Sequence, residues 1–511
     1  MNNKIKIKIV IGIVILFLLG NFSAVGLTQI NTTNNSEIAH PDKPLTNPNG
    51  YPYGWPQIFD GRSDDEGWGL TIDSQNNVIA TGYSVDRQTG ISNILTIKYN
   101  NDGDELWNAS YNTGINDIAF DVTTDSEDNI IIIGFSGSNN NWNGSIIVIK
   151  YNTDGLEQWS KVYRKGISNF PGGIITDSND NIIITVSIGD INQINVSSWT
   201  IKMDPDGNEL WNKIFRESWS DFSLGITIGL QDNIIVVGIS ISPIIGGGFS
   251  IINYDNDGNV LWWRSYDGNQ AWDVAIDSMG NIIIVGDSYS YEYDYTNWYI
   301  IKCNNNGEVL WTREYDSGES DSAMGVAIDS QDNVIVSGHS CFNNYQKYEH
   351  CLIIYDQNGE ELCMRRPEIK GTLMDVEVDN RNTIFVTGSK RTFLMGTSDF
   401  YTDKYFDIIP PSAQMIKPVE NCLYLLNFQL FSLPKNTIII GPLTISVDIE
   451  NPSDVTKVEF YIDNEIMETI NKPPYEWTWN DRGFGKHIIK TMTYDALGNV
   501  FREEISLIKL V

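Results

Sequence analysis

Asp273-Val-Ala-Ile-Asp277-Ser-Met-Gly-Asn281-Ile-Ile-Ile-Val-Gly286 is one copy of a stretch that the chain repeats seven times. Short runs of Ile and Val around a turn that starts at Asp and ends at Asn predict two antiparallel strands joined by a hairpin. The residue that opens this turn recurs about every 50 residues, at Asp73, Asp125, Asp177, Gly229, Asp277, Asp329 and Asp379. Strand-rich repeats of this length are typical of propeller blades.

Each repeat continues into two further strands, as at 298–302 and 310–315. The turn between them carries a glycine after Asp or Asn, which favours a tight hairpin. Four residues after that glycine come Trp107, Trp159, Trp211, Trp262 and Trp311, with Cys363 in the sixth repeat. We expect these indoles to pack between neighbouring blades rather than to bind a ligand.

The two ends of the repeat region complete one another. The seventh repeat supplies strands at 375–378, 383–388 and 400–405 but no fourth strand, whereas 55–59 repeats the Trp-x-x-x-aromatic spacing before the first repeat. We therefore predict an all-β protein in which a seven-bladed propeller over 51–407 is closed by its N-terminal strand. Such closure removes a free sheet edge.

One face of the predicted disc is constant and the other is variable. The turns that join strands 1 to 2 and strands 3 to 4 are nearly the same in every repeat and lie on one side. The loops between strands 2 and 3 lie on the opposite side and differ in each blade, at 85–93, 137–144, 188–198, 241–248, 289–297, 341–349 and 390–398. Variable loops on a rigid scaffold often carry binding, although loops without a role diverge in the same way.

The loop of the fifth blade is the most suggestive for ligand binding. Its aromatic and acidic residues are Tyr289, Tyr291, Glu292, Tyr293, Asp294, Tyr295 and Trp298. Aromatic rings with acceptors beside them suit a sugar, a cationic group or a protein partner. The alternative is a loop that only covers the edge of the disc.

A ring of Asx residues is expected where strand 4 of one blade leads into strand 1 of the next. Its carboxylates are Asp65, Asp117, Asp221 and Asp321. Calcium is the cofactor that such a ring of oxygen ligands would take. Asx residues at a strand entrance also cap their own turn, and both interpretations remain open.

The charge of the chain limits its partners. Lys and Arg total 34 against 66 Asp and Glu, a formal charge of −32 that disfavours nucleic acid and anionic lipid. Three lysines followed by an apolar run predict a signal peptide over 1–26 and a linker over 27–50, so we expect a secreted or cell-surface location. An uncleaved anchor is the alternative, and it is the only membrane contact we expect.

The cysteines and the assembly leave questions open. Five cysteines are too few for a disulfide framework, and Cys341 and Cys351 could pair or remain free thiols. The sequence leaves the oligomeric state open.

The residues after the repeats, 408–511, follow another pattern. Predicted strands at 444–450, 457–462, 475–479, 486–494 and 501–509 are separated by Asn-Pro, Asp-Asn, Pro-Pro and Gly-Asn turns, which favours a β-sandwich. The runs at 458–463, 474–477 and 485–495 resemble a bacterial Ig-like domain. That resemblance implies a spacer or adhesive module in an exported protein.

The repeats themselves resemble the seven-bladed β-propeller repeat family of exported prokaryotic proteins, which implies a surface or secreted location and no defined activity. Sialidase turns have the pattern Ser-x-Asp-x-Gly-x-x-Trp, whereas here Asp102 and Gly103 adjoin and Trp107 follows four residues later. Quinone-dehydrogenase-like repeats share the Gly-x-x-x-Trp spacing, but the vicinal cysteine pair of those enzymes does not occur here.

No catalytic residue is assigned, because the sequence contains no zinc spacing, Gly-rich phosphate loop or nucleophile elbow. We expect a non-enzymatic surface protein that binds a protein or a glycan through its variable loops. The alternatives are a hydrolase or lyase that acts on polysaccharides through acidic residues of that face, and a structural component of the cell envelope.

Overall fold

A computed structural model describes residues 54–138, 143–189, 195–242, 246–290, 295–342, 347–367, 369–391, 397–405, 413–449, 455–480, 483–495 and 499–510. The expected signal peptide and linker lie outside these residues. Within this part of the chain, no helix has the length and apolar character needed to cross a membrane.

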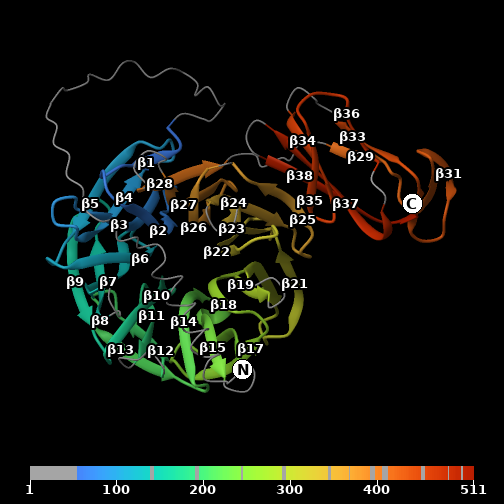
Figure 1. The fold of residues 1–511 in the computed structure, drawn as a ribbon. Coiled ribbons are helices and arrows are strands. Elements are labelled where there is room, and N and C mark those ends of the chain that lie inside the picture. Colours follow the sequence, from blue (N-terminus) through green and yellow to red (C-terminus); the bar gives the residue numbers. More distant parts are fainter. Residues whose placement is uncertain are drawn as a thin grey trace, which may run out of the picture.

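The propeller is built as the sequence predicts, from four-stranded antiparallel sheets arranged in a ring (Figure 1). Blade one contains β2 (Asp65–Ile72), β3 (Val78–Val85), β4 (Ser92–Tyr99) and β5 (Glu105–Tyr111). Blade two contains β6 (Asn116–Thr124), β7 (Ile130–Ser138), β8 (Asn143–Tyr151) and β9 (Glu157–Tyr163). Blade three contains β10 (Ser168–Thr176), β11 (Ile182–Gly189), β12 (Ser197–Met203) and β13 (Glu209–Phe215).

The following blades have the same order. Blade four contains β14 (Ser220–Ile228), a 3-10 turn (Leu230–Asp232), β15 (Ile234–Ser242), β16 (Gly246–Tyr254) and β17 (Val260–Tyr266). Blade five contains β18 (Gln270–Ile276), β19 (Ile282–Ser290), β20 (Tyr295–Cys303) and β21 (Val309–Tyr315). Blade six contains β22 (Asp321–Ile328), β23 (Val334–Phe342), β24 (Lys347–Tyr355) and β25 (Glu361–Arg365). The first strand of each blade lies innermost and packs against the first strand of the next blade.

The predicted closure of the ring is confirmed. Blade seven contains β26 (Gly371–Val378), β27 (Ile384–Arg391) and β28 (Ser398–Tyr405), and its outer strand is β1 (Gln57–Phe59) from the start of the propeller. β1 pairs antiparallel with β28, with Phe59 opposite Phe400. The chain ends of the propeller therefore share one sheet.

The constant face holds neighbouring blades together through a repeated contact that we call the inter-blade latch. In blade five, Lys302 Nζ lies 2.9 Å from a carboxylate oxygen of Asp277, the repeat aspartate, and both side chains are buried. Lys302 Nζ also donates to the carbonyl of Gln357 in blade six, as does the indole N–H of Trp311, at 3.2 and 3.1 Å. The repeat aspartate therefore neutralises a lysine that is bonded to the next blade.

The latch recurs in most blades of the ring. Further buried pairs are Asp73–Lys98, Asp125–Lys150 and Asp177–Lys202. Blade four has Gly229 at the aspartate position and Asn253 at the lysine position, so both charges are missing together. In blade seven, Lys404 and Trp55 both donate to the carbonyl of Asn101 in blade one. Trp55 thus takes the role in blade seven that the repeat tryptophans take in other blades.

The C-terminal domain is a sandwich of two sheets. One sheet contains β29 (Ala413–Lys417), β33 (Leu443–Ile449) and β36 (Tyr475–Trp479). The other contains β30 (Cys422–Leu425), β31 (Phe428–Ser432), β32 (Thr437–Ile440), β34 (Val455–Ile462), β35 (Glu465–Ile470), β37 (Phe484–Asp495) and β38 (Asn499–Leu510). The indole of Trp479 is 3% exposed among the core residues of the sandwich.

Propeller and sandwich are joined through a shared sheet. The outer strand of blade six, β25, pairs antiparallel with β38, with Met364 opposite Val500 and Arg365 opposite Asn499. Met364, Met492, Tyr494 and Val500 belong to one apolar cluster with the core of blade six. One sheet of the sandwich is therefore a continuation of the sheet of blade six.

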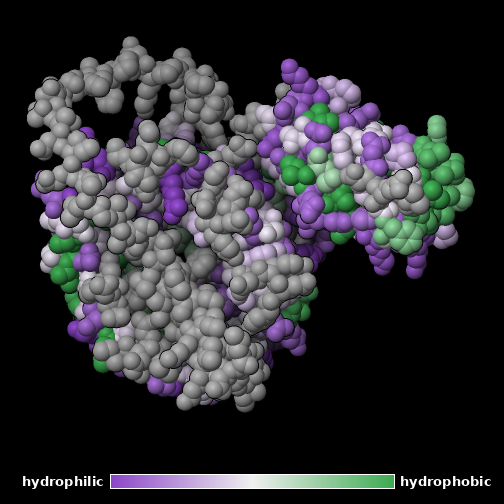
Figure 2. All heavy atoms as spheres, viewed as in Figure 1, coloured by the Kyte–Doolittle hydropathy of each residue, from purple (hydrophilic) through white to green (hydrophobic). Residues whose placement is uncertain are grey.

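Apolar side chains gather at the end of the sandwich furthest from the propeller, over β31 (Figure 2). Phe428 and Phe431 are 73% and 57% exposed there. The five cysteines, by contrast, are all buried thiols, and Cys341 and Cys351 do not form a disulfide.

Candidate functional site

The innermost strands share an irregularity that points side chains into the central channel. In each of them the pairing register shifts after the first few residues, which is a β-bulge. The residues at the shift are Trp68, Phe120, Gly172, Leu224, Trp272, Met324 and Met374. A bulge redirects a side chain that regular alternation would place in the sheet core. The bulge thus presents a large apolar side chain in every blade except blade three, which contributes Phe170 instead.

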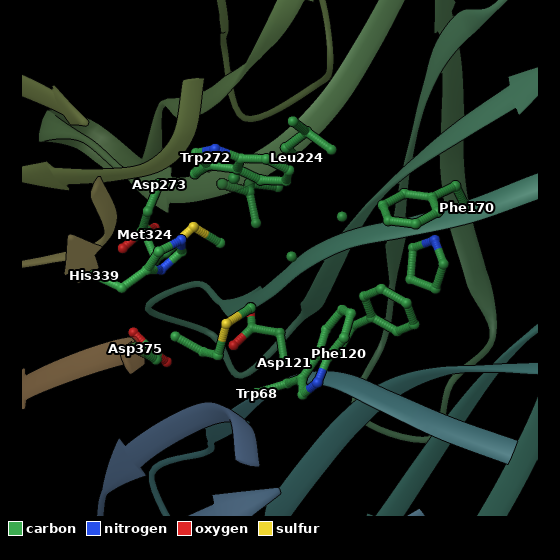
Figure 3. A pocket seen from close by; sticks show the side chains of 16 residues that line it. Trp68, Phe120, Asp121, Phe170, Leu224, Trp272, Asp273, Met324, His339 and Asp375 are labelled. Carbon is green, nitrogen blue, oxygen red and sulfur yellow. The ribbon is translucent and has the colours of Figure 1, made fainter. Parts of the chain in front are cut away.

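These side chains surround a cavity at the end of the channel from which the variable loops extend (Figure 3). We call it the channel mouth, and it has a volume of about 140 Å³. The Trp68 and Phe120 ring centroids are 4.7 Å apart and those of Phe120 and Phe170 are 5.1 Å apart, both edge to face. Trp272 lies on the other side of the cavity from Trp68. The channel mouth is therefore an apolar socket with aromatic walls.

Two buried carboxylates orient the indoles. Trp68 donates its ring N–H to Glu66 at 3.4 Å, and Trp272 donates to Asp287 at 3.1 Å. Glu66 also accepts a hydrogen bond from Ser398, and Asp287 accepts one from Ser322. These hydrogen bonds hold the polar edges of the two indoles that line the cavity.

Three further carboxylates form the floor of the channel mouth, at the position after the bulge. Asp121, Asp273 and Asp375 each accept one backbone N–H from their own strand and one from the next blade. In the other four blades this position is glycine, and at Gly69 an added Cβ would lie 2.6 Å from the backbone of Asp121. The aspartates therefore join their own innermost strand to that of the next blade.

Burial dominates the electrostatics of the mouth. It raises the pKa of Asp121 to about 7 and that of Asp273 to about 6. Burial and the charges of Asp273 and Asp121 raise the pKa of Asp375 well above its usual range. Burial also lowers the pKa of His339, which lines the same cavity, to about 3, so this ring is neutral at physiological pH. The cavity thus combines apolar walls with groups of shifted pKa.

From the raised pKa values of these carboxyl groups we predict that the propeller becomes less stable as the pH rises from 5 to 8. A carboxyl group whose pKa is about 4 in the unfolded chain and 6 to 7 in the folded one binds more protons when folded, so the free energy of unfolding falls across this window. The latch aspartates affect the free energy of unfolding at lower pH. Burial opposes their ionisation, but the bond from the lysine lowers their pKa, so their contribution is lost only below about pH 4.

Thermal unfolding at pH 5 and pH 8 tests this expectation. Asp121→Asn removes one titrating group and keeps an acceptor oxygen, so this variant should lose less stability between the two pH values than the parent chain does. A parent chain that is more stable at pH 8 than at pH 5 would contradict the prediction.

The aspartates predicted as metal ligands cap their own turns. Asp65 accepts the N–H of Gly61, and Asp117 accepts that of Thr113. Asp221 and Asp321 accept N–H groups of Glu217 and Ser317. Among the described residues, no three His, Cys, Asp or Glu side chains are grouped to hold a metal ion. The four aspartates therefore lie in four separate turns, and the structure does not bring them together.

The predicted aromatic patch of blade five falls partly outside the described residues, where Tyr291, Glu292, Tyr293 and Asp294 are found. Tyr289 and Tyr295 are half-buried at the ends of β19 and β20, and the Tyr295 hydroxyl donates to Asp316. Trp298 does not belong to this patch. It is 0% exposed between blades five and six, and its indole donates to the backbone of His339.

Sequence reasoning did not find the residues of the channel mouth. A signal was present, because Trp68, Phe120, Leu224, Trp272 and Met324 all lie three residues after the Asx that opens the innermost strand. Comparing the repeats shows a large apolar residue there in six of seven blades. The extra residue of the bulge hides this face, because it breaks the alternation that assigns side chains to the core.

Residues 431–490 match the Bacterial Ig domain family. An uncharacterized WD repeat-containing protein of Acanthamoeba polyphaga mimivirus, L264, is 33% identical over 140 residues, which are 24% of this chain and 9% of that protein. The chain therefore spans less than a tenth of the length of this curated relative.

Solved structures with a similar fold include the β-propeller domain of the Trilobed protease from Pyrococcus furiosus, which has an open velcro topology. It is 12% identical, with 67% of this chain and 95% of that chain covered and a TM-score of 0.40. An ulvan lyase of polysaccharide lyase family 25 is 12% identical, with 67% and 93% covered and a TM-score of 0.42.

A third structure is the extracellular domain of a hybrid two-component system from B. thetaiotaomicron. It is 12% identical, with 86% of this chain and 61% of that chain covered and a TM-score of 0.40. The chain thus spans less than two thirds of that domain.

Proposed function

We propose that this chain is an exported binding protein, secreted or held at the cell surface, that recognises a glycan or a protein through the channel mouth and the variable loops around it. The observation that carries the proposal is the ring of bulged apolar side chains, two of them indoles fixed by buried carboxylates, on the face with variable loops. Export is supported by the signal-peptide pattern over 1–26 and by the bacterial Ig-like module.

The size of the channel mouth limits what enters it. Pockets that enclose a whole small ligand have volumes of roughly 300–1,000 Å³. At about 140 Å³ the mouth is smaller, so it suits one ring or side chain that projects from a larger partner. The rest of that partner would lie on the loops, as expected for a surface that binds polymers or proteins.

Trp272→Ala is expected to weaken binding at least about tenfold, because the loss of an aromatic anchor at the centre of an interface typically costs about 2 kcal/mol or more of binding free energy. A glycan array and a panel of surface-protein extracts, probed with the purified chain, would identify the ligand, and calorimetry would then compare the variants. Trp263→Ala is the matched control, because this indole is 37% exposed on an outer strand away from the mouth.

Equal binding by the parent chain and Trp272→Ala would show that the ligand does not use the mouth. Trp272→Phe separates two effects, because it retains an aromatic ring but loses the hydrogen bond to Asp287. We expect it to bind with intermediate affinity.

One observation favours a second function, that of a hydrolase or lyase acting on polysaccharides. Asp273, Asp375 and His339 line one cavity and have shifted pKa values, a combination that is common at catalytic sites. The backbone bonds of the two aspartates give them a structural role as well. Release of reducing or unsaturated sugar ends that disappears in Asp375→Asn would favour the enzyme, and binding without product would favour the binding protein.

A further inference from the structure

The apolar side chains of the channel mouth and the carboxylates of its floor are consecutive in the sequence. In three blades an apolar bulge residue is followed at once by an aspartate, and the pairs are Phe120–Asp121, Trp272–Asp273 and Met374–Asp375. One residue advances a strand by about 3.3 Å, so the acidic layer lies directly beneath the apolar layer along the channel. A group that enters from the face with the variable loops therefore meets apolar walls first and carboxylates next.

The three aspartates surround the axis of the channel. They belong to blades two, five and seven, so they are spread almost evenly around the ring of seven. Figure 3 shows them around the same cavity. Burial and the charges of Asp273 and Asp121 raise the pKa of Asp375, so the three groups interact across the channel. A single positive charge on the axis would be close to all three.

The channel continues beneath the aspartates as a second cavity, which we call the inner channel. Its volume is about 350 Å³, and its lining includes the same three aspartates and Glu377. Among the described residues that line the channel mouth and the inner channel, none is Lys or Arg. The negative charge of the ionised carboxylates is therefore not matched by a positive side chain in the lining. A cation that entered would favour the ionised form of these groups.

The order of walls and floor suits a ligand group with an apolar stem and a cationic end. The faces of Trp and Phe rings attract cations, and the carboxylates attract them more strongly. A lysine side chain carries a compact ammonium on a flexible four-carbon stem, whose apolar surface can lie against apolar walls. An amino sugar carries its amino group directly on the ring, without a stem. An uncharged apolar side chain would leave the floor without a partner.

We propose that the channel mouth binds a lysine side chain of a protein partner, with its stem between Trp68 and Trp272 and its ammonium between Asp121, Asp273 and Asp375. The inference rests on the binding function proposed above, and it selects a protein over a glycan as the ligand. The rest of that protein lies on the variable loops.

Titration of the purified chain with short blocked peptides, followed by NMR of the peptide, tests the proposal. The probes are Gly-Gly-Lys-Gly-Gly and the same peptide with norleucine or with acetyl-lysine in place of lysine, together with a glucosamine trimer. We expect the lysine peptide to bind at millimolar concentration. The norleucine peptide, the acetyl-lysine peptide and the glucosamine trimer should bind at least about tenfold more weakly, because the first two lack the charge and the third lacks the stem.

The affinity for the lysine peptide should rise from pH 5 to pH 8. Across this window Asp121 and Asp273, whose pKa values burial raises to about 7 and about 6, lose their protons, while the peptide keeps its charge. Asp375 and Glu377 on β26 also titrate in the channel, and His339 on β23 stays neutral. The innermost strands β2, β10, β14 and β22 contribute no titratable residue to the lining of either cavity.

Asp375→Asn is expected to weaken binding of the lysine peptide at least about tenfold and to leave binding of the norleucine peptide unchanged. Asp206→Asn is the matched control, because Asp206 is exposed in the turn between β12 and β13 on the constant face. This variant should bind the lysine peptide as the parent chain does. Circular dichroism of both variants checks that they fold, and the comparison of peptides on the parent chain does not depend on either.

Equal binding of the lysine and norleucine peptides would overturn the inference. If Trp272→Ala lost both, the channel mouth would still be a binding site, and only the assignment of lysine would fail. Tighter binding of the glucosamine trimer than of the lysine peptide, or no binding of the lysine peptide at millimolar concentration, would also overturn it. The proposed function fails by a different result, when its own ligand binds the parent chain and Trp272→Ala equally.

Discussion

Replacing Trp55 with alanine is expected to destabilise the propeller by about 3–5 kcal/mol, the usual cost of truncating a large buried aromatic side chain. Trp55 is 4% exposed, and its ring packs edge to face on Tyr99 of blade one and Phe385 of blade seven, with centroids 5.6 and 5.8 Å apart. Its indole N–H bonds to Asn101. The variant therefore loses the indole contact that joins blade seven to blade one.

Denaturant unfolding followed by tryptophan fluorescence measures this effect. Ile58→Ala is the matched control, because Ile58 lies on β1 but is 41% exposed, and it should change the free energy of unfolding by no more than about 0.5 kcal/mol. If the two substitutions lowered the free energy of unfolding equally, β1 would be an accessory strand and would not close the ring.

Lys302→Met is expected to cost about 3–5 kcal/mol, because it leaves the carboxylate of Asp277 buried without a counter-charge. The side chains of this pair are 2% and 0% exposed, so water cannot replace the lysine. Blade six shows the contrasting case. It has Ile354 at the lysine position, and there the repeat aspartate, Asp329, is half-buried and reaches water.

The double variant Asp277→Asn with Lys302→Met distinguishes an unpaired charge from a packing defect. The asparagine side chain that it introduces carries no charge but keeps an acceptor oxygen for the backbone N–H groups of Met279 and Asn281, which close the turn. We expect the double variant to be more stable than Lys302→Met alone. Chemical denaturation of the three chains gives the comparison, and an equal or larger loss in the double variant would contradict the electrostatic explanation.

The propeller could be predicted from the sequence because its repeats are locally consistent. In each hairpin between strands 1 and 2 that starts at an Asp, this residue accepts backbone N–H groups of its own turn, as Asp73 does from Gln75 and Asn77. The same residues therefore form the same turn in each of these repeats. The closure by β1 could be predicted because a missing fourth strand and an unmatched Trp spacing stand at opposite ends of the repeats.

The latch could not be predicted in the same way, although its residues were visible. The repeat aspartate was identified as a turn residue, but its lysine partner lies on another strand and its carbonyl partner in another blade. Only the three-dimensional arrangement joins Asp277, Lys302 and Gln357. The paired change to Gly229 and Asn253 in blade four was the signal that a comparison of repeats could have used.

In the sandwich, five strands were predicted and the others were missed. β33, β34, β36, β37 and β38 match the expected strands closely. The strands from β29 to β32 and β35 were not assigned. For β31 the reason is that it is exposed at every position, so buried and exposed residues do not alternate along it.

The sequence-based site on the loops and the site seen at the channel differ for one physical reason. A loop rich in Tyr is visible in the sequence, whereas a cavity made by one residue from each of several blades exists only once the ring is closed. Asp65 and its equivalents accept backbone N–H groups of their own turns, so the described structure does not bring these four aspartates together.

The shared sheet between β25 and β38 has a mechanical consequence. A load applied near the C-terminus reaches blade six through backbone hydrogen bonds and the apolar packing of Met364 and Val500, not through a flexible tether. If the sandwich is the part that faces an attachment point, tension along β38 shears those bonds and is transmitted to the disc, whose orientation then follows the direction of the pull.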